Sequence, residues 1–359
     1  MEYKKLSFKS ISANLLVYGT THAVIDGICA AVIFSILRNQ INGVIDFVSL
    51  IILYNALAFG LQIIFGFLAD YYQSPRAVTL LGCILTGSSA LVLFKFPIIA
   101  IILAGLGNAL FHVGGGSISL NLTPEKATAP GIYVAPGAVG LFIGTLLGKT
   151  GQFLVWPAIL ILAVLCILMF LIKKPEMNYD RRKIRNAEFN YFALILIFVF
   201  LSVAIRSLVG MAVAFPWKVN IDLLITLTIA VTLGKGLGGI LADKYGWIKI
   251  AVGALVLSIP FLIFGAKIPF LGIVGMFLFN ITMPITLVAI SNILPGRPGL
   301  AFGITCLALI FGAFPAFFPI KMIFANSWII VSVIIISALA LFYALRMYYE
   351  NYLEKKLVG

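Results

Sequence analysis

The sequence predicts an all-α integral membrane protein with about twelve transmembrane helices, arranged as two parallel-repeat six-helix bundles. The first observation is composition, since 62% of the 359 residues are hydrophobic and 10% are charged. A soluble protein is about 45–50% apolar and about 25% charged, so this chain lacks the polar residues that a soluble fold needs for its surface. The other two observations are a polar segment near the middle of the chain and a short motif that occurs in both halves.

The apolar runs define the expected helices, because about 20 apolar residues cross a bilayer. Pro, Gly or a charged residue marks nearly every connection between them. The predicted spans are 11–37, 44–70, 76–95, 97–122, 127–148, 152–172, 190–214, 220–242, 247–266, 268–292, 298–320 and 326–348. These spans leave no room for a separate soluble domain.

One long polar connection divides the chain. Residues 173–189, KKPEMNYDRRKIRNAEF, are basic and contain few apolar residues. We therefore expect an N-terminal six-helix bundle at 1–172, a cytoplasmic basic linker at 173–189 and a C-terminal six-helix bundle at 190–359.

The formal net charge of +13 is explained by the distribution of Lys and Arg. When residues at the ends of the predicted spans are counted with the nearer side, 17 of the 25 Lys and Arg residues fall on the side of the N-terminus, six fall on the opposite side and two lie deep within spans. Cytoplasmic loops are enriched in Lys and Arg, so both termini are predicted to be cytoplasmic in a multi-pass protein of the inner or plasma membrane. Nucleic acid is not needed to explain the charge and is not expected as a partner.

The first span contains the sequence THAVIDG near its middle, in which His22 and Asp26 are four residues apart. That spacing places both side chains on one face of a helix. A carboxylate at this depth costs roughly 2.5–3.5 kcal/mol, so it must face a partner or a wet cavity. A protonatable carboxylate beside an imidazole is a physical basis for proton coupling. The alternative is a hydrogen-bonded pair that only stabilises helix packing.

The second and eighth predicted spans end in the same motif. GFLAD at Gly66–Asp70 is repeated 173 residues later as GILAD at Gly239–Asp243. Asn108 pairs with Asn280 at a spacing of 172, and the Pro-Gly pair at 130–131 matches the one at 298–299 at a spacing of 168. Because each half has an even number of spans, the two copies have the same orientation, which is typical of alternating-access transporters.

This repeated motif resembles the loop motif of the major facilitator superfamily. The second copy follows the pattern closely, whereas the first has Tyr71 and Gln73 where a basic residue and a glycine are usual. The glycine permits close helix approach, and the aspartate can pair with loop cations or with a helix N-terminus when the cytoplasmic side closes. An interfacial Asp that merely ends a helix is the alternative. The predicted gating residues are Gly66, Asp70, Arg76, Gly239, Asp243, Lys244, Gly246 and Lys249.

The fourth span, GLGNALFHVGGGSISL, is rich in glycine around His112. Together with His22 and Asp26, it resembles the fosmidomycin-resistance branch of the superfamily, in which a glycine-rich stretch ends in Phe-His-Pro. Phe111 and His112 match this pattern, and Val113 stands in place of the proline. The resemblance implies export of small molecules by proton antiport. A packed, hydrogen-bonded histidine is the alternative for His112.

The seventh and eighth spans each carry a cation. A guanidinium such as that of Arg206 suits bidentate binding of carboxylate or phosphate. Lys235 either faces the substrate or extends its amine towards the cytoplasm. Two cations favour an anionic or zwitterionic substrate, and an ion pair between Asp26 and Arg206 that acts as a gate is the competing explanation.

These residues predict a secondary active transporter that moves a small, anionic or zwitterionic organic solute, with proton coupling and efflux favoured. The substrate-binding and coupling residues are expected to be His22, Asp26, His112, Arg206 and Lys235. Walker, HExxH and GxSxG motifs are absent from the sequence, so neither an ATP-driven pump nor an enzyme is expected, and no cofactor. The expected partners are the solute, protons and the lipid bilayer, and a monomer suffices.

A divalent transition-metal carrier is the alternative function. Imidazole and carboxylate groups are suitable ligands for such metals, and His22, Asp26 and His112 would supply them. Arg206 and Lys235 would oppose a cation, which favours the anionic solute.

Overall fold

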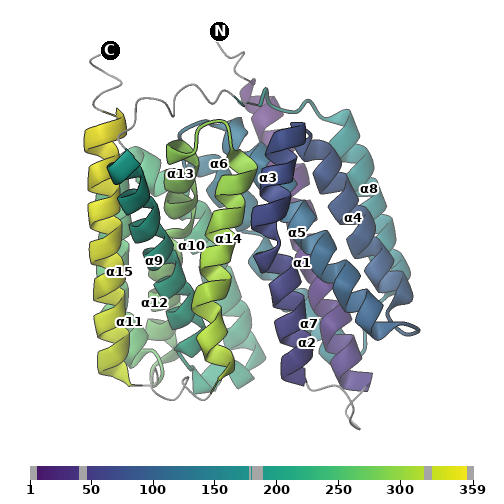
Figure 1. The fold of residues 1–359 in the computed structure, drawn as a ribbon. Helices are drawn as coiled ribbons and strands as arrows, with labels where there is room; N and C mark the ends of the chain where they lie inside the picture. The colour runs from purple at the N-terminus through teal and green to yellow at the C-terminus, as the bar shows by residue number, and fades with distance from the viewer. Residues whose placement is uncertain (1–5, 40–46, 178, 180–188, 319–325, 354–359) are drawn as a thin grey trace. The chain divides into compact units, whose positions relative to one another are not determined.

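The computed structural model describes residues 6–39, 47–177, 179, 189–318 and 326–353. Every regular element in these ranges is a helix (Figure 1). Ten helices of the described chain are long and apolar enough to cross a membrane, and two shorter apolar helices, Val155–Leu171 and Pro298–Ala313, bring the number to twelve. The predicted all-α membrane fold is confirmed. Most of the predicted basic linker, at 178 and 180–188, lies outside the described residues.

The first half of the chain forms helices that follow the predicted spans. A π-helical turn at Ala56–Gly60 joins α2 to α3 within one apolar span, Val48–Tyr72. The span Thr128–Thr150 is likewise divided, into α6 and α7. The helices are α1 (Phe8–Asn39), α2 (Phe47–Asn55), α3 (Gln62–Tyr72), α4 (Pro75–Val92), α5 (Pro97–Leu122), α6 (Thr128–Val134), α7 (Gly137–Thr150) and α8 (Val155–Leu171).

The second half contains one interrupted span that bears on function. The apolar span Pro269–Ile293 is broken into α12 and α13 at residues 281–282. Pro284 lies in the first turn of α13, where the N–H that proline lacks is not needed by the helix. The helices are α9 (Phe189–Ala212), α10 (Ile221–Tyr245), α11 (Trp247–Phe264), α12 (Pro269–Asn280), α13 (Met283–Ile293), α14 (Pro298–Ala313) and α15 (Ser327–Tyr348).

The chain divides into two compact units. The first unit comprises Met1–Pro124, Tyr133–Tyr179 and Arg297–Gly303, and the second comprises the remainder. Two short segments are therefore grouped with the other half of the sequence: 125–132 with the second unit and 297–303 with the first. The division at 172 and 190 that the sequence suggests stays a prediction.

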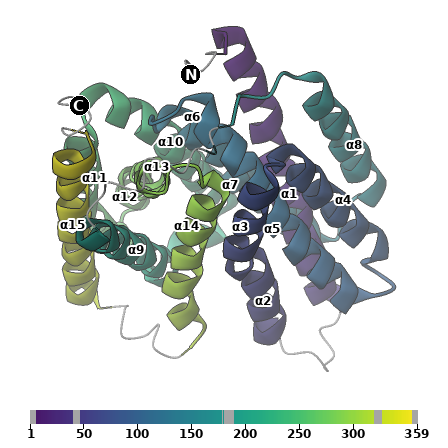
Figure 2. The same cartoon turned by 45° about the horizontal axis from the view of Figure 1, so that its top comes forward.

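Glycines allow helices within the first unit to approach closely. A Cβ atom on Gly140 of α7 would overlap the backbone carbonyl of Ala23 in α1, and one on Gly144 would overlap that of Gly27. Small residues at intervals of four are the usual contact surface of membrane helices, because dispersion contacts replace the hydrophobic effect there. Figure 2 shows α1 beside both α5 and α7 in this unit.

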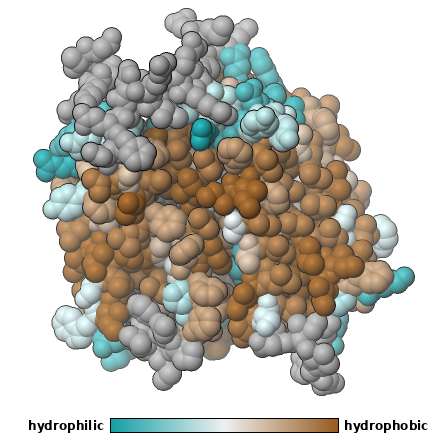
Figure 3. Space-filling view, viewed as in Figure 1, coloured by the Kyte–Doolittle hydropathy of each residue, from teal (hydrophilic) through white to brown (hydrophobic). Residues whose placement is uncertain are grey.

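Large apolar side chains cover the outside of the helices. On α8, for example, Leu160, Ile167 and Phe170 are each more than half exposed. On the face shown in Figure 3, hydrophobic side chains occupy the middle, and hydrophilic ones lie towards the upper and lower edges. Exposed apolar surface on this scale is stable in lipid and not in water.

Candidate functional site

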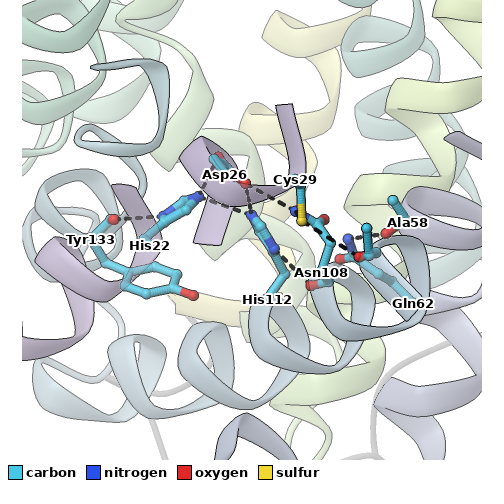
Figure 4. Close-up of polar contacts among 9 residues, drawn as sticks. His22, Asp26, Cys29, Ala58, Gln62, Asn108, His112 and Tyr133 are labelled. Atoms are coloured by element: carbon cyan, nitrogen blue, oxygen red, sulfur yellow. Dashed lines mark hydrogen bonds and ion pairs between the residues drawn. The ribbon is translucent and has the colours of Figure 1, made fainter. Parts of the chain in front are cut away.

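His22, Asp26 and His112 form one cluster in the first unit (Figure 4). One nitrogen or oxygen atom from each side chain lies within 4.8 Å of the others. The Nε2 atom of His22 is 3.2 Å from Asp26 Oδ2, and the Nε2 atom of His112 is 3.6 Å from Asp26 Oδ1. The two Nε2 atoms are 2.9 Å apart. Three of the five predicted substrate and coupling residues are thus side by side.

Backbone carbonyls orient both imidazoles. Nδ1 of His22 lies 2.9 Å from the carbonyl oxygen of Tyr133, and Nδ1 of His112 lies 2.8 Å from that of Asn108. Each imidazole therefore directs its Nε2 atom towards the other ring and towards Asp26 (Figure 4). A histidine held through one nitrogen presents the other to a proton or a metal ion in a fixed direction.

Asn108 is a site residue that the sequence analysis used only as a repeat marker. Its amide donates a hydrogen bond of 3.0 Å to Asp26 Oδ1, and it lies one turn before His112 on α5. Its buried carbonyl oxygen Oδ1 has no hydrogen-bond partner among the described residues. The i,i+4 spacing of Asn108 and His112 was the signal that they share a face.

The cluster is buried near the middle of α1 and α5. His22 and His112 are 4% and 8% exposed, and Asp26 retains about a fifth of its side-chain exposure. Gly137, the first residue of α7, packs directly on the pair, since a Cβ atom there would lie 2.5 Å from His22 Nε2 and 2.6 Å from Asp26 Oδ2. The absence of a side chain at Gly137 therefore leaves the space in which the imidazole and the carboxylate meet.

Arg206 lies in the second unit and is 7% exposed. One nitrogen of its guanidinium, Nη1, donates to the hydroxyls of Thr282 at 2.9 Å and Thr286 at 3.4 Å. The other terminal nitrogen, Nη2, is buried, and among the described residues it has no hydrogen-bond partner and no carboxylate within ion-pair distance. Thr282 lies in the break between α12 and α13, and Thr286 lies one turn further on, in α13.

Lys235 lies on α10 and is half-buried. Its carbonyl oxygen is 2.9 Å from the place where a Cβ atom on Gly131 would stand. Its role in binding substrate stays a prediction, as does the ion pair between Asp26 and Arg206.

The aspartates of the repeated loop motif each bind a helix N-terminus. Asp70 accepts hydrogen bonds of 2.9 and 2.8 Å from the backbone N–H groups of Gly299 and Leu300, at the start of α14. Asp243 accepts bonds of the same lengths from Ala127 and Thr128, at the start of α6. A carboxylate at these positions satisfies N–H groups that the helix leaves unpaired and interacts favourably with its dipole.

The glycines of the motif permit this contact. A Cβ atom on Gly66 would overlap the backbone of Gly299, and one on Gly239 would overlap that of Ala127. The bound segments are 172 residues apart, close to the spacing of 173 between the two aspartates. The Pro-Gly pairs at a spacing of 168 are therefore not the equivalent positions, and that part of the predicted repeat alignment is wrong.

The remaining residues of the motif shape the loops. Arg76 donates a hydrogen bond of 2.7 Å to the carbonyl of Ile172. Gly246 ends α10 with φ +99°, and Gln73 ends α3 in the first copy with φ +52°, so glutamine adopts the left-handed conformation that glycine favours. Lys244 and Lys249 are exposed.

The described part of the linker lies near the first motif. Burial, together with the negative charge of Asp70, raises the pKa of Tyr179. Tyr179 is therefore neutral over the physiological pH range.

Loss of the Asp243 charge should weaken the start of α6. We expect Asp243→Asn to cost about 1 kcal/mol, because an amide cannot accept from both N–H groups as the carboxylate does. Hydrogen exchange should quicken at Ala127 and Thr128. The exposed Asp222→Asn variant is the control, and equal exchange rates in the two variants would contradict the role of Asp243.

No model of a known protein family matches the chain, and no curated protein sequence matches it. Solved structures do match. The fucose:proton symporter FucP of E. coli is 12% identical, with a TM-score of 0.66 over 96% of this chain and 98% of FucP. The human organic anion transporter MFSD10 is 14% identical, with a TM-score of 0.66 over 91% of this chain and 99% of MFSD10. A structure of FucP in the outward conformation gives a TM-score of 0.62 at 12% identity, over 92% of this chain and 99% of that one.

These similarities define the fold. The matched structures are transporters of the major facilitator superfamily, and they are covered over nearly their whole length. The chain therefore has the major facilitator fold of a multi-pass membrane protein. The resemblance to the fosmidomycin-resistance branch stays a prediction.

Proposed function

We propose that this protein is a secondary active transporter that moves a small anionic or zwitterionic organic solute by alternating access, coupled to protons, with efflux favoured. The observation that carries the proposal is the buried cluster of His22, Asp26 and His112 inside a major facilitator fold. Both termini are cytoplasmic in this proposal, as the distribution of Lys and Arg favours.

Ionisable side chains in the middle of a membrane protein are rare, because placing them there costs free energy. They are therefore taken as functional residues unless other evidence speaks against it. Asp26 lies beside two imidazoles, which are protonatable, and accepts a hydrogen bond from one amide, which is not. Binding or release of a proton at this cluster would therefore change the contacts between the helices that carry its side chains. The names of the matched transporters, a fucose:proton symporter and an organic anion transporter, support small-solute transport and leave the solute open.

The substrate's charge follows from Arg206. A guanidinium that is buried with no acid beside it among the described residues leaves a positive charge that an anion can neutralise. Nη2, which has no hydrogen-bond partner among the described residues, offers donors of the kind that hold a carboxylate, phosphate or phosphonate. The break between α12 and α13 supports this role, because transporters place interrupted helices at their substrate sites.

Arg206→Lys should weaken binding of the anionic solute about tenfold, equivalent to about 1.4 kcal/mol. Lysine keeps the charge but loses the planar pair of donors. Binding would be measured by the solute concentration that gives half-maximal exchange in liposomes. The exposed Lys95→Gln variant is the control, and equal changes in the two variants would exclude a role of Arg206 in binding.

The proposed function is tested by solute exchange in liposomes that contain the purified protein. Organic anions, lipophilic cations and divalent metals would be supplied as three separate classes. Exchange with an anion class alone is the expected result. Exchange with lipophilic cations alone would overturn the assignment of substrate charge.

A divalent transition-metal carrier is the second candidate. The observation that favours it is that two imidazole nitrogens and one carboxylate lie within 4.8 Å of one another, a set that suits such metals. In that case the metal is the substrate and the liposome experiment would show exchange with metals alone. The buried positive charge of Arg206 favours the anionic solute instead.

A further inference from the structure

Two buried donors at the first turn of α13 have no acceptor among the described residues. They are the Nη2 atom of Arg206 and the backbone N–H of Ile285, and both belong to the second unit. We infer that these two groups together bind a carboxylate of the solute, and that Thr282 positions the guanidinium for this contact. The statement that the carboxylate belongs to a transported solute rests on the proposed function, whereas the site rests on contacts within the second unit.

The start of α13 leaves one backbone donor unused. Pro284 has no N–H, and the N–H of Thr286 donates to the carbonyl of Thr282 at 3.1 Å. The N–H of Ile285 lies between these two positions, and the described part of the chain supplies no acceptor for it. Ile285 is fully buried, so a ligand must satisfy this N–H or its burial costs free energy.

Thr282 is the N-cap residue of α13, but its hydroxyl does not cap the helix. An N-cap hydroxyl usually accepts from the N–H two or three residues further on, which would include that of Ile285. The Thr282 hydroxyl instead accepts from Arg206 Nη1 at 2.9 Å and donates to the carbonyl of Phe279 at 3.3 Å. It therefore directs the guanidinium to the first turn of α13 and leaves the helix N-terminus uncapped.

The positive charge at this turn has no acid to balance it. The N-terminus of a helix carries about half a positive charge, and the guanidinium of Arg206 adds a full one. The described acids of the second unit lie elsewhere: Glu125 and Asp222 are exposed, Asp243 binds the start of α6, and Glu350 pairs with Arg346. Like charges repel at this turn until an anion binds between them.

The free donors suit a carboxylate. The Nη2 atom and the N–H of Ile285 are two donor groups for two carboxylate oxygens, and one negative charge balances that of Arg206. A doubly charged phosphonate would need a second cation. Lys235 is the residue near enough to supply one, since a Cβ atom on Gly131 would lie 2.9 Å from the Lys235 carbonyl and 3.2 Å from Pro284. The choice between the two acids therefore shows whether Arg206 acts alone.

Binding of acetate and methylphosphonate tests the class of ligand. The purified protein would be studied in nanodiscs of uncharged lipid by saturation-transfer NMR, at a pH where methylphosphonate carries two charges. We expect acetate to bind at least about tenfold more tightly than methylphosphonate. Equal or tighter binding of methylphosphonate would overturn the assignment of a carboxylate.

Arg206→Gln and Thr282→Val test the two side chains. Arg206→Gln should weaken acetate binding at least about tenfold, and Thr282→Val about fivefold, whereas Thr282→Ser, which keeps the hydroxyl, should bind as the unmodified protein does. The exposed Lys95→Gln variant is the control. Unchanged binding in Arg206→Gln would overturn the site. Equal binding by the valine and serine variants would overturn the positioning role of Thr282.

The backbone N–H can be observed directly. The chain contains three Pro-Ile pairs, at 97–98, 284–285 and 319–320. Labelling with ¹³C-carbonyl proline and ¹⁵N-isoleucine gives one amide signal for each pair, and Ile285→Val identifies the signal of Ile285 by its loss. Acetate should shift this signal and leave that of Ile98 in place. No shift at saturating acetate would overturn the role of α13.

The inference and the proposed function fail in different ways. A shift of the Ile285 signal by acetate, without exchange of any organic anion in liposomes, would overturn the proposed transport and leave the binding site intact. Exchange of an organic anion that does not shift this signal would overturn the inference and leave the proposed transport intact.

Discussion

Asp26→Asn is expected to abolish proton-driven solute transport, with a loss of at least about a hundredfold, while the protein still folds. The carboxylate accepts from Asn108 and compensates the histidine pair, so its loss removes the charge that holds the coupled proton. Asparagine has nearly the same shape, which preserves the packing of α1. Solute uptake driven by a pH gradient would be measured in liposomes.

Two controls separate coupling from folding in this experiment. Asp26→Asn should unfold within a few degrees of the unmodified protein. Asp222→Asn, which removes an exposed carboxylate, should transport normally. Unchanged pH-driven uptake in a folded Asp26→Asn protein would contradict proton coupling through this residue.

Gly140→Ala is expected to destabilise the first unit by about 3 kcal/mol or more, because it overfills a closely packed contact. A methyl group at Gly140 would overlap the carbonyl oxygen of Ala23 and lie 2.6 Å from its carbonyl carbon. These are backbone atoms, so α1 and α7 would have to move apart. The midpoint of unfolding, by heat or by denaturant in detergent, measures the effect.

Gly253→Ala is the matched control for this prediction. Gly253 is also inside a helix, α11, and a Cβ atom there would meet no atom within 4 Å. This variant should be neutral or more stable by up to about 1 kcal/mol, the usual advantage of alanine over glycine in a helix. Equal destabilisation of the two variants would show that the contact between Gly140 and Ala23 is not close.

Hydropathy alone predicts most of this fold. A membrane allows few architectures, and an apolar run of about 20 residues forms a helix there whatever its detailed sequence. The internal breaks are harder to predict, because the span Pro269–Ile293 has the length and mean hydropathy of one continuous membrane helix, and its interruption at 281–282 depends on tertiary contacts. Those contacts include the hydrogen bond from Arg206.

Part of the candidate site could also be predicted. The i,i+4 spacing places His22 and Asp26 on one face, and a polar residue in an apolar helix, such as His112, draws attention by its cost. The sequence could not show that the carbonyl of Tyr133 orients His22, because that contact joins residues 111 positions apart.

The structure around the loop motif could likewise be predicted only in part. Repetition of glycine and aspartate at Gly66, Asp70, Gly239 and Asp243 predicts two equivalent structures, and a helix N-terminus is a natural partner for a carboxylate. The motif does not say which helices the two aspartates bind. The structure shows that Asp70 binds the start of α14 and Asp243 binds the start of α6.

Proton movement that accompanies solute movement tests the central claim most directly. Liposomes containing the unmodified protein and an entrapped pH dye would receive an inward gradient of an organic anion that the exchange experiment has identified. Proton coupling predicts a change in internal pH that depends on both the protein and the solute gradient. Solute uptake at an unchanged rate, with no change in internal pH, would contradict it.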